Sequence, residues 1–258
     1  MGNQFVKSAD LAEQGLRADP GMTAFSRNVL GVMERIEYRL CESGEDLEDI
    51  FRLRYNSYLA TGLLTADASH MIVDSYDDMP NTYNYGVYYD GNLVSTIRLQ
   101  HVTREFPNTP SVKLFHDVLE PRLEAGETFI DPGRLAADLE WSSTLKVLPY
   151  ITSRLAMLAC HYFNVSACLQ TIRGEHAAFY KRVHAAEPLV QGREYPGLTC
   201  LADLWQSPCP LMWEQGMARF AFFRSTPLEE RMLFTRSSDT YRAPLTILPS
   251  AKYLSHAA

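Results

Sequence analysis

Apolar residues recur at strand and helix spacings along the first half of the chain. Before residue 34 they predict one or two short helices, interrupted by a proline and a glycine at residues 19–21. Ile36, Tyr38 and Leu40 alternate with other residues and predict a strand over residues 37–41. Acidic residues 45 and 46 then open a helix whose apolar positions follow an i, i+3, i+4 spacing.

A polar stretch over residues 65–81 is typical of a loop. Residues 83–89 and 93–101 follow as two strand patterns, and Asp90-Gly91 between them predicts a hairpin. In the second half we expect strands and helices to alternate over residues 115–123 (helix), 128–137 (strand), 145–163 (helix), 166–172 (strand), 177–185 (helix), 197–205 (strand) and 212–223 (helix).

Early antiparallel pairing followed by crossover units predicts an α/β (α+β) fold with one mixed central sheet and helices on both faces. We expect three parts in the chain. Residues 1–33 form an N-terminal helical extension, residues 34–206 form the domain, and residues 207–258 form a C-terminal extension packed on it.

Composition and charge exclude several classes of protein. A net charge of −7 argues against a surface built for nucleic acid. No apolar run approaches the roughly 18–20 residues of a transmembrane helix. The five cysteines form no CxxC pair, and their odd number fits reduced thiols in a cytoplasmic protein. The histidines lack ligand spacing, so we expect no metal site.

Residues 128–138, TFIDPGRLAAD, combine an apolar strand pattern with Asp131, Pro132, Gly133 and Arg134. Proline removes a ladder donor and glycine weakens a strand, so Pro132-Gly133 predicts a bulge or a local loss of pairing. A carboxylate and a guanidinium flank the expected break. Asp131 could pair with Arg134 and hold the bulge, or it could act as a base.

The order of elements resembles the GNAT acyltransferase fold. In that fold two parallel strands splay apart and admit the pantetheine arm of an acyl donor. The resemblance makes residues 128–137 and 166–172 the splayed strands. It also implies that backbone N–H groups at the break bind pantetheine and a thioester oxyanion. The glycine-rich pyrophosphate loop of that family is absent from residues 138–155, which favours acyl-phosphopantetheine on an acyl carrier protein as the donor.

A narrower resemblance is to the autoinducer-synthase branch, which comprises acyl-homoserine-lactone synthases and long-chain N-acyl amino acid synthases. The matching positions, in order and at similar intervals, are Arg54 with Tyr58, Asp74 with Asp77, Arg98, and Asp131 with Arg134. Aspartate replaces the usual glutamate at position 131. Lactone synthases carry a tryptophan where this chain has Gly62-Leu63-Leu64, and the longer chain also favours the N-acyl amino acid synthases.

The resemblance assigns roles, and each has a structural alternative. Asp131 and Arg134 belong to the catalytic group, with Tyr180 as the acid that protonates the leaving thiolate; Tyr180 could equally be a core aromatic. The residues expected to bind the amine acceptor are Arg54, Tyr58, Asp74, Asp77 and Arg98, which could instead form structural ion pairs. The residues expected to bind the acidic carrier protein are Arg173, Lys181, Arg182 and Arg193, which could instead form a solvated face.

The sequence therefore favours an N-acyltransferase that moves a medium- or long-chain acyl group from acyl carrier protein to the amine of an amino acid or related small acceptor. Three alternatives stay open. They are an acyl-homoserine-lactone synthase, a CoA-dependent N-acetyltransferase, and a non-catalytic module that binds a carrier protein or a lipid thioester.

Overall fold

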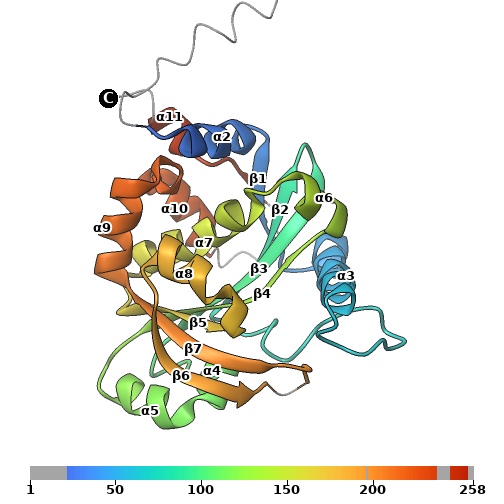
Figure 1. Ribbon diagram of the computed structural model, residues 1–258, viewed down its shortest axis with the longest axis vertical. Coiled ribbons are helices and arrows are strands. Elements are labelled where there is room, and N and C mark those ends of the chain that lie inside the picture. The colour runs from blue at the N-terminus through green and yellow to red at the C-terminus, as the bar shows by residue number, and fades with distance from the viewer. Residues whose placement is uncertain (1–21, 196, 237–244, 255–258) are drawn as a thin grey trace, which may run out of the picture.

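A computed structural model describes residues 22–236, except residue 196, and residues 245–254. Within those residues one mixed sheet of eight strands has the order β6-β7-β5-β4-β3-β2-β1-β8 and carries helices on both faces (Figure 1). The mixed α/β fold predicted from the sequence is confirmed. The helices expected before residue 22 lie outside the described residues.

The N-terminal half forms an antiparallel meander. Its elements are α2 (Ala24–Met33), β1 (Ile36–Leu40), α3 (Gly44–Ala60), β2 (Thr82–Tyr89) and β3 (Asn92–Val102). Asp90 and Gly91 join β2 to β3 with φ angles of 47° and 77°. Both angles lie in the left-handed region that a two-residue Asp-Gly hairpin requires. The predicted hairpin is confirmed, and β3 continues by pairing antiparallel with β4 (Phe129–Ala137).

Two short helices, α4 (Pro110–Leu114) and α5 (His116–Glu124), connect β3 to β4. Thr109 caps α4, because its Oγ1 accepts a hydrogen bond from the Val112 N–H at 3.2 Å. Apolar side chains of α4 and α5 pack with Phe129 and Leu169 in one buried cluster on this face of the sheet. This packing positions Ser111, the second residue of α4, against the sheet.

The parallel strands β4 and β5 (Ala167–Ile172) separate almost at once. Only two residue pairs join them, Phe129 with Ala167 and Ile130 with Cys168. Beyond Ile130, β4 has no strand partner on that side, whereas its pairing with β3 continues to Ala137. We call the space between the two strands beyond Ile130 the interstrand gap. The predicted splaying of these strands is therefore present.

The bulge lies two residues later than the sequence suggested. Pro132 and Gly133 keep register partners on β3, Leu99 and Arg98. The register with β3 shifts after that point, where Arg134 and Leu135 oppose the single residue Ile97. Arg134 takes a φ of 53°, which is unusual for a residue with a side chain. Pro132 is therefore paired within the ladder, and Arg134, two residues later, forms the bulge.

The opposite face of the sheet carries four helices of the second half of the chain. They are α6 (Leu139–Thr144), α7 (Leu148–Phe163), α8 (Ala177–His184) after the 3-10 turn Gly174–His176, and α9 (Cys209–Arg219). The helix expected over residues 145–163 begins later and is preceded by the separate helix α6. Asp138 caps α6 through the N–H groups of Glu140 and Trp141, and Pro149 stands in the first turn of α7.

Strand β6 (Glu187–Glu194) was not predicted. It forms the edge of the sheet beside β7 (Leu201–Pro208), with Pro188 and Gly192 within it. Neither face of β6 is fully buried, so its residues show no alternation of apolar and polar positions. Strand β7 begins later than the predicted strand at residue 197 and pairs antiparallel with β5.

The C-terminal segment adds the 3-10 turn Ala221–Phe223, α10 (Pro227–Phe234), strand β8 (Thr246–Ile247) and α11 (Ala251–Leu254). Strand β8 pairs with β1 at the far edge of the sheet. A buried ion pair ties α10 to α7, because Arg154 Nη1 lies 2.5 Å from Glu229 Oε1. The described part of this segment thus packs on the sheet and on α7, although the three-part division of the chain stays a prediction.

Candidate active site

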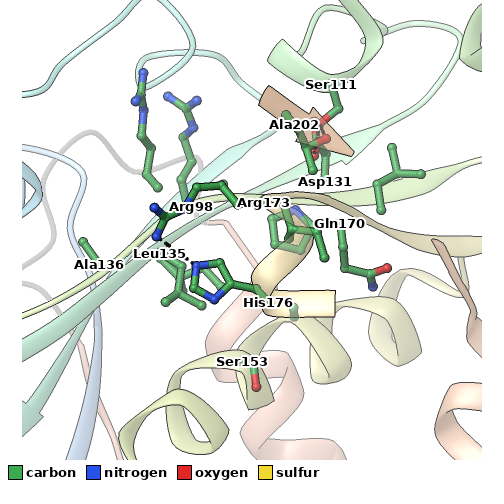
Figure 2. Close-up of a pocket in the computed structure, with 18 of the residues that line it drawn as sticks. Arg98, Ser111, Asp131, Leu135, Ala136, Ser153, Gln170, Arg173, His176 and Ala202 are labelled. Carbon is green, nitrogen blue, oxygen red and sulfur yellow. Dashed lines mark hydrogen bonds between the residues drawn. The ribbon is translucent and has the colours of Figure 1, made fainter. Parts of the chain in front are cut away.

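A cavity of about 500 Å³ opens at the interstrand gap. We call it the central cavity. Its lining comes from both faces of the sheet, because it includes Ser111 and Asp131 on the α4 side and Ser153 and Cys168 on the α7 side. Figure 2 shows Ser111 beside Asp131 at one end of the view and Ser153, on α7, at the other. The cavity therefore passes through the sheet where β4 and β5 have no mutual pairing.

Asp131 is 3% exposed and faces this cavity. Its Oδ1 accepts a hydrogen bond from Ser111 Oγ at 2.7 Å, whereas Oδ2 has no hydrogen-bond partner among the described residues. Burial raises the pKa of Asp131 above its usual value, and neighbouring hydroxyls and the charge of Arg98 oppose this only in part. A raised pKa makes the carboxylate a stronger base.

Arg54, Asp77 and Asn84 form the buried base of a charged network. Arg54 Nη1 lies 2.8 Å from Asp77 Oδ1, and its Nη2 donates to Asn84 Oδ1 at 2.8 Å. Asn84 Nδ2 on β2 donates to the Asp77 carbonyl at 3.1 Å, so the loop after α3 is held against β2. Arg54 is fully buried and does not line the central cavity, which makes its contacts structural.

Arg98 and Arg134 extend the network to the cavity wall. Arg98 Nη1 lies 2.6 Å from Asp74 Oδ1, and Arg134 Nη2 lies 2.6 Å from Asp74 Oδ2. Burial acts to raise the pKa of Asp74, but the two guanidinium charges outweigh it and hold that pKa below its usual value. Three guanidinium groups face two carboxylates, so the network carries one uncompensated positive charge.

Three tyrosines add phenols to the cavity wall. Tyr58 near the end of α3 and Tyr195 after β6 both act electrostatically on Arg134, and burial raises the pKa of Tyr195 to about 12. Tyr180 on α8 lies near Cys168 and Tyr58, and burial raises its pKa above the usual phenol value. Tyr180 and Tyr195 therefore keep their protons at neutral pH.

Several cavity residues were not singled out from the sequence. Ser111, Thr171 and Tyr195 carry no motif, and only the packing of α4, β5 and the turn after β6 brings them to Asp131 and Arg134. Several residues of this lining have a buried polar atom with no hydrogen-bond partner among the described residues; the atoms are Arg98 Nε, Gln100 Nε2, Asp131 Oδ2, Arg134 Nε, Gln170 Oε1 and His184 Nε2. Such atoms are costly unless a ligand satisfies them.

The four expected carrier-protein residues fall into different surroundings. Arg173 lines the central cavity and pairs with Glu175 at 2.9 Å; Figure 2 shows it beside His176. Lys181 and Arg182 are exposed on α8. Arg193 on β6 binds Asp117 in bidentate fashion, with N–O distances of 2.6 and 2.7 Å. This pair fastens β6 to α5, so Arg193 has a structural partner.

Within the described ranges, no three His, Cys, Asp or Glu side chains are grouped as a metal would require. None of the helices in the described part of the chain is long and apolar enough to cross a membrane.

A mixed sheet whose parallel strands splay around a cavity with a buried carboxylate defines a GNAT-like acyltransferase. The family model "N-acyl amino acid synthase FeeM" matches residues 49–206, which is more than half of the chain. The chain belongs to this family of acyltransferases.

A solved structure supports the fold. FeeM, an N-acyl amino acid synthase from uncultured soil microbes, matches with a TM-score of 0.59 at 15% identity, over 71% of this chain and 96% of FeeM. The acyl-homoserine-lactone synthase LasI matches with a TM-score of 0.47 at 13% identity, over 69% of this chain and 94% of LasI. No curated protein matches the sequence.

Proposed function

We propose that this acyltransferase moves a fatty acyl group from acyl carrier protein to the amine of an amino acid. One observation carries the proposal. A buried carboxylate with a free oxygen, Asp131, shares one cavity with Arg98 and Arg134, which belong to a network with an excess positive charge. The carboxylate suits an amine that must lose a proton, and the positive charge suits the carboxylate of that same acceptor.

The reaction is aminolysis of a thioester. Asp131 takes a proton from the acceptor amine, and the nitrogen attacks the thioester carbon. The resulting oxyanion accepts hydrogen bonds from backbone N–H groups of β4 beyond Ile130, where the strand has no partner on the side of β5. Tyr180, protonated at neutral pH, donates to the departing thiolate. Arg134 orients the acceptor carboxylate, with Tyr58 beside it.

The shape and polarity of the cavity support a phosphopantetheine arm. That arm carries two amides and a hydroxyl, and the unpaired atoms Gln170 Oε1 and His184 Nε2 are suited to such groups. The gap between two splayed strands also leaves backbone groups of β4 free for the amides.

The segment after β4 supports a carrier protein over CoA as the donor. Helix α6 follows β4 directly, and the N–H groups at its start are already bonded to the Asp138 carboxylate. Glu140 adds a second negative charge, and Lys146 is the only basic residue between Asp138 and Arg154 in the sequence. A CoA pyrophosphate would be repelled here, whereas the phosphodiester of a carrier protein would extend to the exposed cations Lys181 and Arg182 on α8.

The proposal is tested by incubating the purified protein with acyl carrier protein thioesters and a mixture of amino acids. The acyl chains have about 8–18 carbons, the range of common fatty acids. Mass spectrometry is expected to detect an N-acyl amino acid, with a kcat/KM for acyl carrier protein at least ten times that for the matching acyl-CoA. Preference for acyl-CoA would support the CoA-dependent alternative, and a lactone product formed from S-adenosylmethionine would support a lactone synthase. Absence of any N-acyl product would overturn the proposal.

A further inference from the structure

A chain of hydroxyl and carboxyl groups crosses the interstrand gap beside Asp131. Ser111 Oγ on α4 donates to Asp131 Oδ1 on β4 at 2.7 Å, and the same Oγ lies 2.6 Å from Thr171 Oγ1 on β5. Serine has one hydroxyl proton, and here it points to Asp131. Thr171 therefore donates to Ser111, and the three groups form a directed chain from β5 to the carboxylate.

The proposed reaction releases a proton that needs an exit. The acceptor amine enters as an ammonium ion at neutral pH. The balanced reaction converts RNH₃⁺ and R′C(O)SR″ into R′C(O)NHR, R″SH and H⁺. One C–N bond forms and one C–S bond breaks. Of the two protons lost from nitrogen, one ends on sulfur and the other must reach solvent in every turnover.

Burial prevents Asp131 from passing this proton directly to solvent. Asp131 is 3% exposed and Ser111 is 2% exposed. Thr171 is partly exposed and also lines the central cavity, so it is the end of the chain that meets water in that cavity. The titratable groups that act on Asp131 from neighbouring elements are Arg98 on β3 and Tyr195 after β6. A guanidinium group has no site that accepts a proton, and burial keeps the Tyr195 phenol protonated at neutral pH.

We propose, on the basis of the function proposed above, that Ser111 and Thr171 relay the proton from Asp131 to solvent. Asp131 takes the proton on its free oxygen Oδ2, whereas Ser111 contacts Oδ1. A half-turn of the carboxyl group about the Cβ–Cγ bond therefore brings the protonated oxygen to Ser111, and the hydrogen bonds reverse. Asp131 donates to Ser111, Ser111 donates to Thr171, and Thr171 gives a proton to water or buffer. One proton leaves, both hydroxyls are regenerated, and Asp131 returns to the carboxylate. Ser111 and Thr171 are positioning residues for the base.

Replacement of the exposed hydroxyl tests the relay. Thr171→Val keeps the shape of the side chain and removes the donor, whereas Thr171→Ser keeps the hydroxyl. We expect Thr171→Val to lower kcat about tenfold with both KM values within twofold, and Thr171→Ser to retain most of the activity. In Thr171→Val the solvent deuterium isotope effect on kcat is expected to increase, and kcat is expected to recover as imidazole buffer is raised at constant pH and ionic strength.

A double-mutant cycle tests whether the two hydroxyls act as one chain. Thr171→Val is expected to have no further effect on kcat in a Ser111→Ala background. Thr152→Val is the matched control, because Thr152 Oγ1 lies 2.5 Å from Ser95 Oγ in a buried pair that does not line the central cavity. It is expected to leave kcat, the isotope effect and the buffer dependence unchanged.

The outcomes separate the relay from the proposed function. An active wild-type enzyme whose kcat is unaffected by Thr171→Val overturns the relay and leaves the function intact. A lower kcat in Thr171→Val that neither recovers with buffer nor shows a changed isotope effect also overturns the relay, because a purely structural role explains it. The same holds if Thr171→Ser loses as much activity as Thr171→Val. A wild-type protein that forms no N-acyl product overturns the proposed function and the relay with it.

Discussion

Asp131 and Arg134 lie three residues apart on β4, yet each bonds to a different partner. Arg134 Nη2 binds Asp74 at 2.6 Å, and Asp131 Oδ1 binds Ser111 at 2.7 Å. No ion pair joins the two side chains, and Asp131 Oδ2 is left without a partner among the described residues. Asp131 therefore does not pair with Arg134, which was the structural alternative to a catalytic role. The free oxygen of Asp131 supports a role as a base.

Asp131→Asn is expected to lower kcat by about 10²- to 10⁴-fold, because the amide cannot accept the amine proton. Its dissociation constant for acyl carrier protein thioester is expected to stay within threefold of the wild-type value. Steady-state kinetics and fluorescence titration measure the two effects. Asp90→Asn, a matched change in the β2–β3 hairpin, is expected to retain full activity. An Asp131→Asn enzyme with wild-type turnover would remove Asp131 from the mechanism.

Arg134→Gln is expected to raise the KM for the amino-acid acceptor about 10- to 100-fold, because a charged hydrogen bond contributes about 1.5–3 kcal/mol. The KM for the acyl donor is expected to change less than threefold. Arg52→Gln is the control, since Arg52 is exposed on α3 and pairs with Glu48 at 3.6 Å. A larger change in the donor KM than in the acceptor KM would contradict the assigned role.

Lys181→Glu is expected to raise the KM for acyl carrier protein at least fivefold, because it places a negative charge where an acidic partner would dock. The effect should shrink as salt is raised, and acyl-pantetheine without the protein should show no such effect. Arg52→Glu makes the same change in charge on α3 and is expected to leave this KM unchanged. Equal effects in both variants would indicate a response to net charge alone.

Arg154→Met is expected to lower the free energy of unfolding by about 3–5 kcal/mol, because it leaves Glu229 as an unpaired buried charge. Burial acts to raise the pKa of Glu229, but Arg154 outweighs it and the folded pKa is lowered. The pair therefore stabilises the fold above pH of about 4.3, the unfolded pKa of glutamate, and this contribution is lost as the pH falls further. Urea unfolding measures both effects, with the exposed Arg35→Met as control.

His184 is expected to make stability depend on pH. Burial lowers its pKa to about 4, whereas the unfolded value is about 6.5. The unfolded chain therefore binds more protons between these values, and the free energy of unfolding should fall by about 2 kcal/mol from pH 7 to pH 5. His184→Phe should remove that part of the slope, whereas exposed His116→Gln should leave it. An unchanged slope in His184→Phe would show that His184 is protonated in the folded protein.

Much of the fold could be predicted from the sequence alone. Alternation in β1 and the i, i+3, i+4 spacing in α3 are local consequences of burying one face, so these elements could be assigned from the chain. The Asp90-Gly91 hairpin is likewise a local backbone preference. Edge strand β6 was missed because neither of its faces is fully buried, and no pattern marks it.

The candidate site was only partly visible in the sequence. Asp131 and Arg134 stood out because polar residues interrupt an apolar strand. Asp74, the partner of Arg134, was found only through the family resemblance. Ser111 and Thr171 could not be found from the sequence, since they lie 20 and 40 residues from Asp131 and carry no motif.

The sequence by itself determined which segments form strands and helices, and which strand carries the base candidate. Only the tertiary structure decided that β4 separates from β5 after Ile130, that the bulge falls at Arg134, and that Ser111 bridges Asp131 to Thr171. The physical reason is that secondary structure follows from neighbours along the chain. A cavity and its hydrogen bonds arise instead where packing brings distant strands and helices together and leaves a space between them.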